Sequence, residues 1–145
     1  MIALITNVVL YILVVCAEKI VNCWGEIMGY ESRLYIVEES DFKIPCDNGK
    51  TWAEVIGMVD LCVCYPIKDV FTKVANGYIY ADDGNTRIEE DKYGEPFSVA
   101  SLKDVIEKLK EIIKETNYRR AKVALGFLES VYEDMPDCVV YHYGH

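Results

Sequence analysis

Three side chains near the C-terminus, Cys138, His142 and His145, are of the types that bind zinc. Zinc sites in proteins use four nitrogen or sulfur ligands, and Cys62 and Cys64 would complete such a set if the tail paired beside the strand that carries them. The spacing matches no standard zinc site, and Cys138 and His142 share a strand face by chance as easily as by design. Two interpretations stay open, a zinc site and a set of buried thiols with a core histidine, and the second is favoured.

No recognised catalytic motif occurs in the sequence: it has no glycine-rich phosphate loop, nucleophile elbow, zincin helix or calcium loop. The segment 82–85 resembles a calcium loop only in being acidic, because it lacks the alternating oxygen ligands. A nucleophilic cysteine needs a histidine beside it, and both histidines stand at the end of the chain. We therefore expect a protein that is not an enzyme and needs no cofactor, with zinc as the alternative.

The segment 80–95 is rich in carboxylates and also carries tyrosines. Carboxylates at phosphate-like spacing can occupy the basic channel of a nucleic-acid-binding protein, so that the segment would act as a DNA mimic. Tyrosine is enriched at the centres of protein interfaces. A solvated acidic hairpin is the commoner structure for such a segment. The candidate partner-binding residues are Asp82, Asp83, Glu89, Glu90, Asp91, Glu95, Tyr80 and Tyr93.

The formal net charge of −9, from 24 acidic and 15 basic residues, argues against direct binding to nucleic acid or to an anionic membrane. It favours a basic host protein as the partner. The 145 residues are enough for one domain with a real core, which needs no disulfides, so we read the six cysteines as free thiols in a reducing cytoplasm. Composition leaves the oligomeric state open.

Residues 1–17 are almost wholly apolar, slightly short of the ~20 residues of a membrane-spanning helix, and no Lys or Arg precedes them. Trp24, Gly25 and Glu26 are encoded as TGG-GGN-GAR, a purine-rich stretch that resembles a ribosome-binding site just upstream of Met28. Residues 1–27 are therefore either a membrane anchor or read-through of upstream DNA. Residues 28–145 form the expected single domain in both cases.

The first half of this domain has the residue pattern of strands and turns. Residues 33–38 have strand composition and end in an acidic run, and residues 47–50 predict a turn. Residues 53–65 form an apolar run typical of a central strand or of the end of a helix that leads into one. Apolar residues at helical spacing predict a short helix from Pro66 to Val74. Residues 78–80 and 86–89 then predict a β-hairpin with an acidic tip.

The second half predicts two amphipathic helices and a last strand. Ser101 and Asp104 are the expected capping pair of a helix over residues 101–115. Asn117 separates it from a second helix over 119–133, which ends before Pro136. Residues 138–143 alternate like a strand that returns to the sheet. The expected fold class is α+β, a small sheet with a pair of amphipathic helices packed on one face.

Three segments, residues 28–37, 80–84 and 142–144, resemble a group of small proteins carried by phages and mobile elements of Gram-positive bacteria. In that group the first of these motifs typically begins the protein, which agrees with a start at Met28. The resemblance implies no catalytic residue. It implies a context, since small acidic phage proteins often inhibit host machinery, among them anti-CRISPR proteins that block a CRISPR effector nuclease by contact. Fold and context do not fix function, so this inhibitor role is an expectation.

Overall fold

The computed structural model describes residues 32–43, 49–62 and 64–144. They belong to a compact unit, Glu31–His145, and the apolar leader lies outside them. In this described part, no helix has both the length and the apolar character needed to cross a membrane. In chain order the elements are β1 (Ser32–Lys43), β2 (Thr51–Cys62), the 3-10 helix η1 (Tyr65–Val70), β3 (Lys73–Val74), β4 (Gly77–Tyr80), β5 (Arg87–Ile88), β6 (Ser98–Ser101), α2 (Leu102–Thr116), α3 (Arg119–Asp134) and β7 (Val139–Tyr143).

The strands form one curled mixed sheet in the order β3-β6-β7-β1-β2-β4-β5. β2 and β4 run parallel, whereas the other neighbours are antiparallel. The C-terminal β7 lies between β1 and β6, so the expected return of the tail to the sheet is confirmed. Because β7 pairs on both sides, its backbone groups are satisfied within the sheet.

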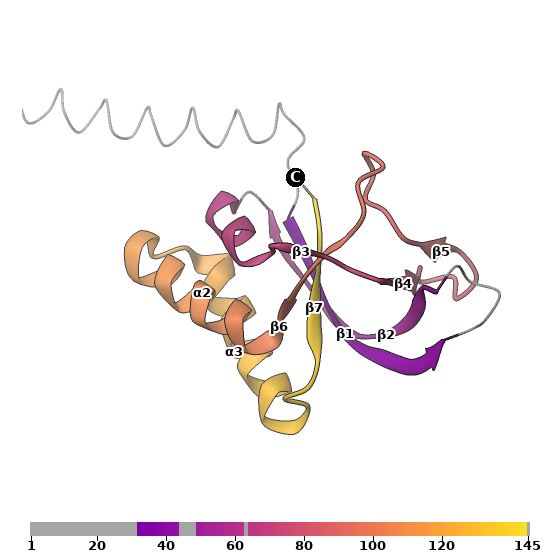
Figure 1. Ribbon diagram of the computed structural model, residues 1–145. Helices are drawn as coiled ribbons and strands as arrows, with labels where there is room; N and C mark the ends of the chain where they lie inside the picture. The colour runs from indigo at the N-terminus through magenta and orange to yellow at the C-terminus, as the bar shows by residue number, and fades with distance from the viewer. Residues whose placement is uncertain (1–31, 44–48, 63, 145) are drawn as a thin grey trace, which may run out of the picture. The chain divides into compact units, whose positions relative to one another are not determined.

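The curl of the sheet is held by the short segment that carries β3 and β4. The Ala75 amide donates to the Phe97 carbonyl (2.7 Å), and the Thr51 amide donates to the Asn76 carbonyl (3.0 Å). Through β3 the segment pairs with β6, and through β4 it pairs with β2. Figure 1 shows it crossing in front of β7. One stretch of chain thus ties together strands from both sides of the sheet.

Two apolar clusters lie on opposite faces of this sheet. The cluster on the helix side holds residues of α2 and α3, such as Leu109 and Leu128, together with Ile36 of β1. The cluster inside the curl holds Val37, the next residue of β1, and Tyr141 of β7. Adjacent strand residues point to opposite faces, so β1 serves both clusters. Both helices pack on one face of the sheet, as the sequence predicts.

The ends of the helices follow their capping residues. The Ser101 hydroxyl accepts a hydrogen bond from the Asp104 amide (3.0 Å) at the start of α2. Asn117 takes the left-handed conformation (φ 55°) at its end, which asparagine tolerates better than most residues. α3 then runs from Arg119 to Asp134. The predicted capping pair, the break and both helices are confirmed.

The helix predicted from Pro66 to Val74 is wrong in its second half. A 3-10 helix covers Tyr65–Val70, and Lys73–Val74 forms strand β3 against β6. Ile67 is fully buried, whereas Val74 has a relative exposure of 67%. The helical spacing of apolar residues therefore does not mark one buried face here, and pairing with β6 overrides it.

The strands also differ from the sequence prediction: β1 is longer than expected and β6 is an additional strand. β1 continues through the acidic residues to Lys43, because β2 pairs with Glu38 and Glu39 and, after an irregularity, with Lys43. β6, between Pro96 and the cap of α2, was not predicted. Its four residues give too short a pattern to stand out, and its pairing with β3 and β7 comes from distant parts of the chain.

Candidate binding surface

The acidic β-hairpin is built from β4 and β5, in which Ile79 pairs with Ile88 and Tyr80 with Arg87. Its tip is ordered by the carboxylate of Asp83, which accepts hydrogen bonds from the Asn85 and Thr86 amides (2.9 and 2.8 Å). It also accepts from the Thr86 hydroxyl. These hydrogen bonds hold the pKa of Asp83 below its usual range, and the one from the Thr86 hydroxyl has the largest effect. Asp82 and Asp83 are both exposed, and the carboxylate of Asp83 also shapes the tip.

The loop after β5 is ordered in a similar way by Asp91. This residue is almost completely buried, and its carboxylate accepts hydrogen bonds from the amides of Tyr93 (2.8 Å) and Glu95 (3.1 Å). The backbone closes the same turn, because the Asp91 amide donates to the Glu95 carbonyl (2.8 Å). Gly94 has a φ of +81°, which glycine adopts without strain. Asp91 is thus an internal anchor rather than a contact residue.

This anchoring predicts a measurable loss of stability in Asp91→Ala. Two amides would lose a charged acceptor, so the free energy of unfolding should fall by about 1 kcal/mol. Urea unfolding at neutral pH measures the change. The exposed Asp82→Ala is the matched control and should stay within about 0.5 kcal/mol of the parent. Equal unfolding of parent and Asp91→Ala would contradict the anchoring role.

Glu89 also faces inward. Its carboxylate forms ion pairs with Lys50, which precedes β2, and with Arg87 of β5. The hydrogen bond from Lys50 is the main cause of its lowered pKa. The Arg87 guanidinium lies 3.7 Å from the centre of the buried Tyr78 ring, a cation–π geometry. Glu89 therefore fastens the hairpin to the sheet.

Six of the eight predicted binding residues are exposed. One of them is Asp83, whose carboxylate orders the tip, and the other five are Asp82, Glu90, Glu95, Tyr80 and Tyr93. The tyrosines have relative exposures of 41% (Tyr80) and 47% (Tyr93). The Tyr80 ring stands edge-on against Tyr78, with centroids 5.6 Å apart. The Lys92 amino group lies 5.1 Å from the Tyr93 ring centre. We call these five exposed residues the acidic–tyrosine surface.

Sequence reasoning missed a neighbouring group on the sheet. Tyr35 of β1 is half-buried, which raises its pKa, and the negative charge of Asp82 adds to the rise. The Tyr35 ring lies 6.3 Å from that of Tyr143, over which the Arg33 guanidinium sits at 5.8 Å. Asp82, at the tip of the hairpin, thus interacts electrostatically with this strand tyrosine. The pairing of β1 with β7 brings these residues together from the two ends of the domain. No local sequence pattern reveals such a pairing, so the sequence did not point to this group.

The candidate zinc ligands lie in different surroundings. Cys138 is buried in the helix-side cluster, and burial raises the pKa of its thiol, as it does for Cys64. His142 follows four residues later on the same face, which puts the two Cα atoms about 13 Å apart along an extended strand. One ion cannot bridge that distance. His145 lies outside the described residues, and among those described no three His, Cys, Asp or Glu residues form a metal-binding group.

His142 has a structural environment of its own. Its Nε2 lies 2.9 Å from the hydroxyl of the buried Ser32, and its ring stacks on Phe71 with centroids 4.8 Å apart. A shallow pocket of about 390 Å³ lies beside it, lined also by Lys68 and Glu95. Ser32 is completely buried, so its hydroxyl is out of reach of a substrate. The pair fixes the end of β7 against the start of β1.

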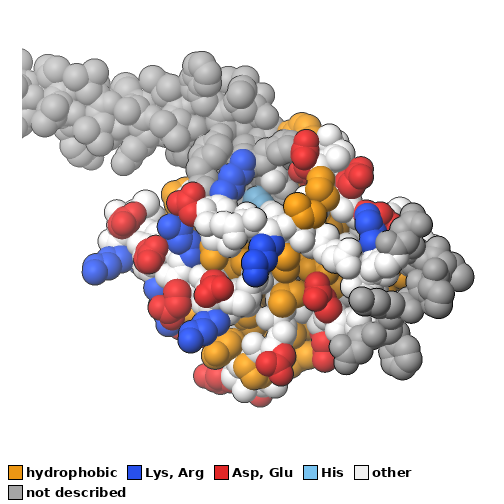
Figure 2. Space-filling view, viewed as in Figure 1, with side chains coloured by type: hydrophobic (Ala, Val, Ile, Leu, Met, Phe, Trp, Pro, Cys, Tyr) orange, Lys and Arg blue, Asp and Glu red, His pale blue; other side chains and the backbone are white. Residues whose placement is uncertain are grey.

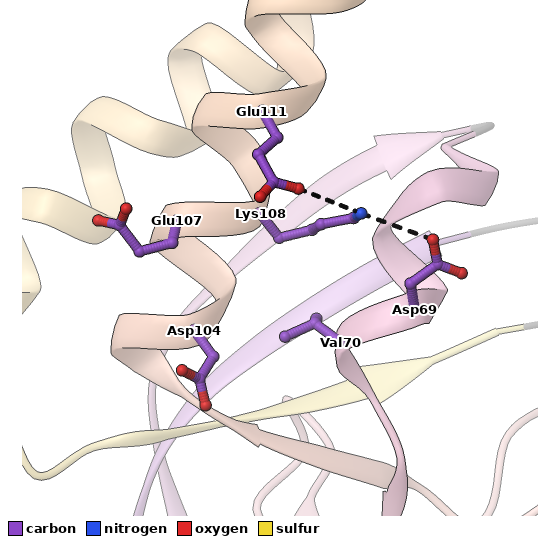
Figure 3. A pocket seen from close by; sticks show the side chains of 6 residues that line it. All are labelled: Asp69, Val70, Asp104, Glu107, Lys108 and Glu111. Atoms are coloured by element: carbon purple, nitrogen blue, oxygen red, sulfur yellow. Dashed lines mark hydrogen bonds and ion pairs between the residues drawn. The ribbon is translucent and has the colours of Figure 1, made fainter.

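A second acidic patch lies between η1 and α2, in a pocket of about 300 Å³ (Figure 3). Lys108 lies between Asp69 of η1 (3.5 Å) and Glu111 of α2 (3.3 Å). Its pKa is raised, chiefly by the hydrogen bond with Glu111. Figure 2 shows acidic and basic side chains interspersed over the helices. Exposed ion pairs of this kind add little stability and mark no site.

Comparison of the chain with protein-family models, with curated proteins and with solved structures gives no match. The function must therefore be argued from the geometry of the surface itself.

Proposed function

We propose that the chain is a non-catalytic binding protein that docks its acidic–tyrosine surface onto a basic protein. The partner is a nucleic-acid-binding protein of a host cell, such as a CRISPR nuclease, and the chain acts as a phage-type inhibitor. Exposed carboxylates beside amphipathic aromatic rings suit a basic channel, in which they replace the phosphates and bases of the nucleic acid.

One observation carries this proposal: Asp83 and Asp91 use their carboxylates to order the two loops. The loops are thereby preorganised, and a rigid loop loses less conformational entropy on binding than a flexible one. Asp82, Glu90 and Glu95 are then free to meet a partner's basic groups. The tyrosines add contact area with few rotatable bonds.

The test is capture of partners by the full chain from a lysate of a CRISPR-bearing Gram-positive bacterium, in parallel with two charge-reversal variants. The first variant replaces Asp82, Glu90 and Glu95 by Lys. Its control replaces Glu115, Glu133 and Asp134 of the helical region, which are equally exposed, and changes the net charge by the same amount. Asp83 and Glu89 are left intact, because they hold the hairpin.

We expect a nucleic-acid-binding protein to be retained by the parent and by the helix control. The variant with Lys at positions 82, 90 and 95 should bind this protein at least about tenfold more weakly. Excess DNA should compete with the parent chain for the partner. Equal retention by both variants would show that only the net charge matters, and the surface would lose its role. Retention that DNA does not affect would contradict the DNA-mimic mechanism.

A further inference from the structure

The outer edge of β2 is exposed over most of its length. On this side β4 pairs with Thr51 and Trp52, and beyond Trp52 no described strand pairs with β2. The exposed part carries apolar side chains, with relative exposures of 37% for Val55 and 50% for Met58. Free strand edges of this kind pair readily with another strand.

A bulge in β2 gives this edge a symmetric pattern. Val55 pairs with Val37 and Gly57 pairs with Ile36, so Ile56 is the extra residue. Ala53 and Val55 therefore lie on the inner face of the curl, and so do Met58 and Asp60, which pair with Tyr35 and Arg33. Ile56 and Val59 pack on the helix side, where a Cβ at Gly57 would also point. Residues at equal distances on either side of the Ile56–Gly57 bond, such as Val55 and Met58, therefore lie on the same face of the sheet.

This symmetry selects one register for a second, antiparallel copy of β2. With the two-fold axis at the Ile56–Gly57 bond, Val55 lies opposite Met58 of the second copy, and opposite residues share a face throughout. A register shifted by one residue places Glu54 opposite Asp60, where like charges repel, and mixes the faces. Bulges and charged residues often protect strand edges from pairing. Here Glu54 and Asp60 flank the exposed edge, and the residues between them are apolar, so the centre of the edge remains able to pair.

The helix beside this edge complements the charges. The start of α3 lies at the far end of β2, since the Tyr118 hydroxyl donates to the Leu61 carbonyl (2.5 Å) and Arg120 lies 4.0 Å from Asp60. In the antiparallel pair, this end of one copy meets the Glu54 end of the other. Glu54 lies on the helix side, so Arg120 of each copy approaches Glu54 of the second. Val123 and Phe127, with relative exposures of 75% and 39%, add apolar area on the same side.

We infer that β2 is a self-association edge, which joins two copies of this chain through antiparallel β2–β2 pairing with a two-fold axis at the Ile56–Gly57 bond. The contact involves one strand and one helix face from each copy, so it belongs to the weak, concentration-dependent class of interfaces. It uses residues outside the acidic–tyrosine surface, so it stands or falls independently of the proposed function.

Hydrogen–deuterium exchange of the full chain, compared at about 5 and about 500 µM, tests the pairing, because outward amides of β2 gain acceptors in the dimer. We expect the peptide that covers β2 to exchange more slowly at the high concentration. Met58→Lys should abolish this difference. Val74→Lys, at a more exposed apolar position on β3, is the control and should retain it.

A charge swap tests the register. Glu54→Arg and Arg120→Glu should each weaken the association about tenfold, and the double variant should restore it. Exchange in β2 that does not depend on concentration would overturn the inference. So would a concentration effect that survives Met58→Lys, or a double variant as weak as the single ones, because each would place the contact elsewhere or in another register.

Discussion

Gly77→Ala should lower the free energy of unfolding by about 2–4 kcal/mol, the range for overpacking a site that cannot relax. Gly77 begins β4, where a Cβ would overlap the Tyr141 hydroxyl and approach the Thr51 carbonyl oxygen to 3.1 Å. Tyr141 has no room to retreat: it is completely buried, its ring stacks on Phe97, and its hydroxyl donates to the Glu39 carboxylate. Urea unfolding measures the effect.

Two other glycines serve as controls for this prediction. A Cβ at Gly57 would meet the ring of Phe127, which is partly exposed and can move, so Gly57→Ala should cost less. Gly126 lies in α3 with open space around it, so Gly126→Ala should raise stability by about 0.5–1 kcal/mol through helix propensity. A Gly77→Ala protein as stable as the parent would show that Gly77, at the start of β4, does not pack tightly against Tyr141.

Raising the pH from about 8 to about 11 should destabilise the protein, with Tyr141 as a principal cause. Burial, followed by the hydrogen bond to Glu39 and its negative charge, raises the pKa of Tyr141 far above its usual value. The folded protein therefore keeps this proton, whereas an unfolded tyrosine releases it near pH 10. The stability that Tyr141 contributes is complete below that pH and falls by about 1.4 kcal/mol at pH 11.

Unfolding of Tyr141→Phe at both pH values isolates this contribution. The variant should be less stable than the parent at pH 8, because the hydrogen bond to Glu39 is lost. Between pH 8 and pH 11, however, its free energy of unfolding should decrease by about 1.4 kcal/mol less than that of the parent. The remaining fall includes Tyr35 and Tyr118, whose pKa values burial also raises. An identical alkaline fall in parent and variant would mean that Tyr141 ionises in the folded protein.

Local sequence signals were sufficient for α2, α3, the hairpin and the last strand. The capping pair of Ser101 and Asp104 and the break at Asn117 act within a few residues, so their effect is readable from sequence. β3 and β6 were missed because each exists through pairing with distant strands. Val74 had the right spacing for a helix, yet strand pairing decided its conformation.

The candidate surface was located by its composition, but the roles of its residues were not. Asp82 and Asp83 are adjacent, chemically identical and both exposed, and only the fold shows that the Asp83 carboxylate orders the tip. Glu90 and Asp91 are likewise adjacent carboxylates, and the fold shows that Asp91 is the buried one. Backbone amides within four residues bind the carboxylates of Asp83 and Asp91. Glu89 is bound by Lys50, a cation that becomes its neighbour only in the folded chain.

The most direct test of the docking surface is a hydrogen–deuterium exchange footprint of the full chain, alone and saturated with the captured partner. The proposal predicts slower exchange in residues 80–95 in the complex, with the outer faces of α2 and α3 unchanged. Slower exchange confined to the helices, with 80–95 unaffected, would contradict it. The partner would then bind elsewhere, and the exposed carboxylates of the hairpin would serve solubility alone.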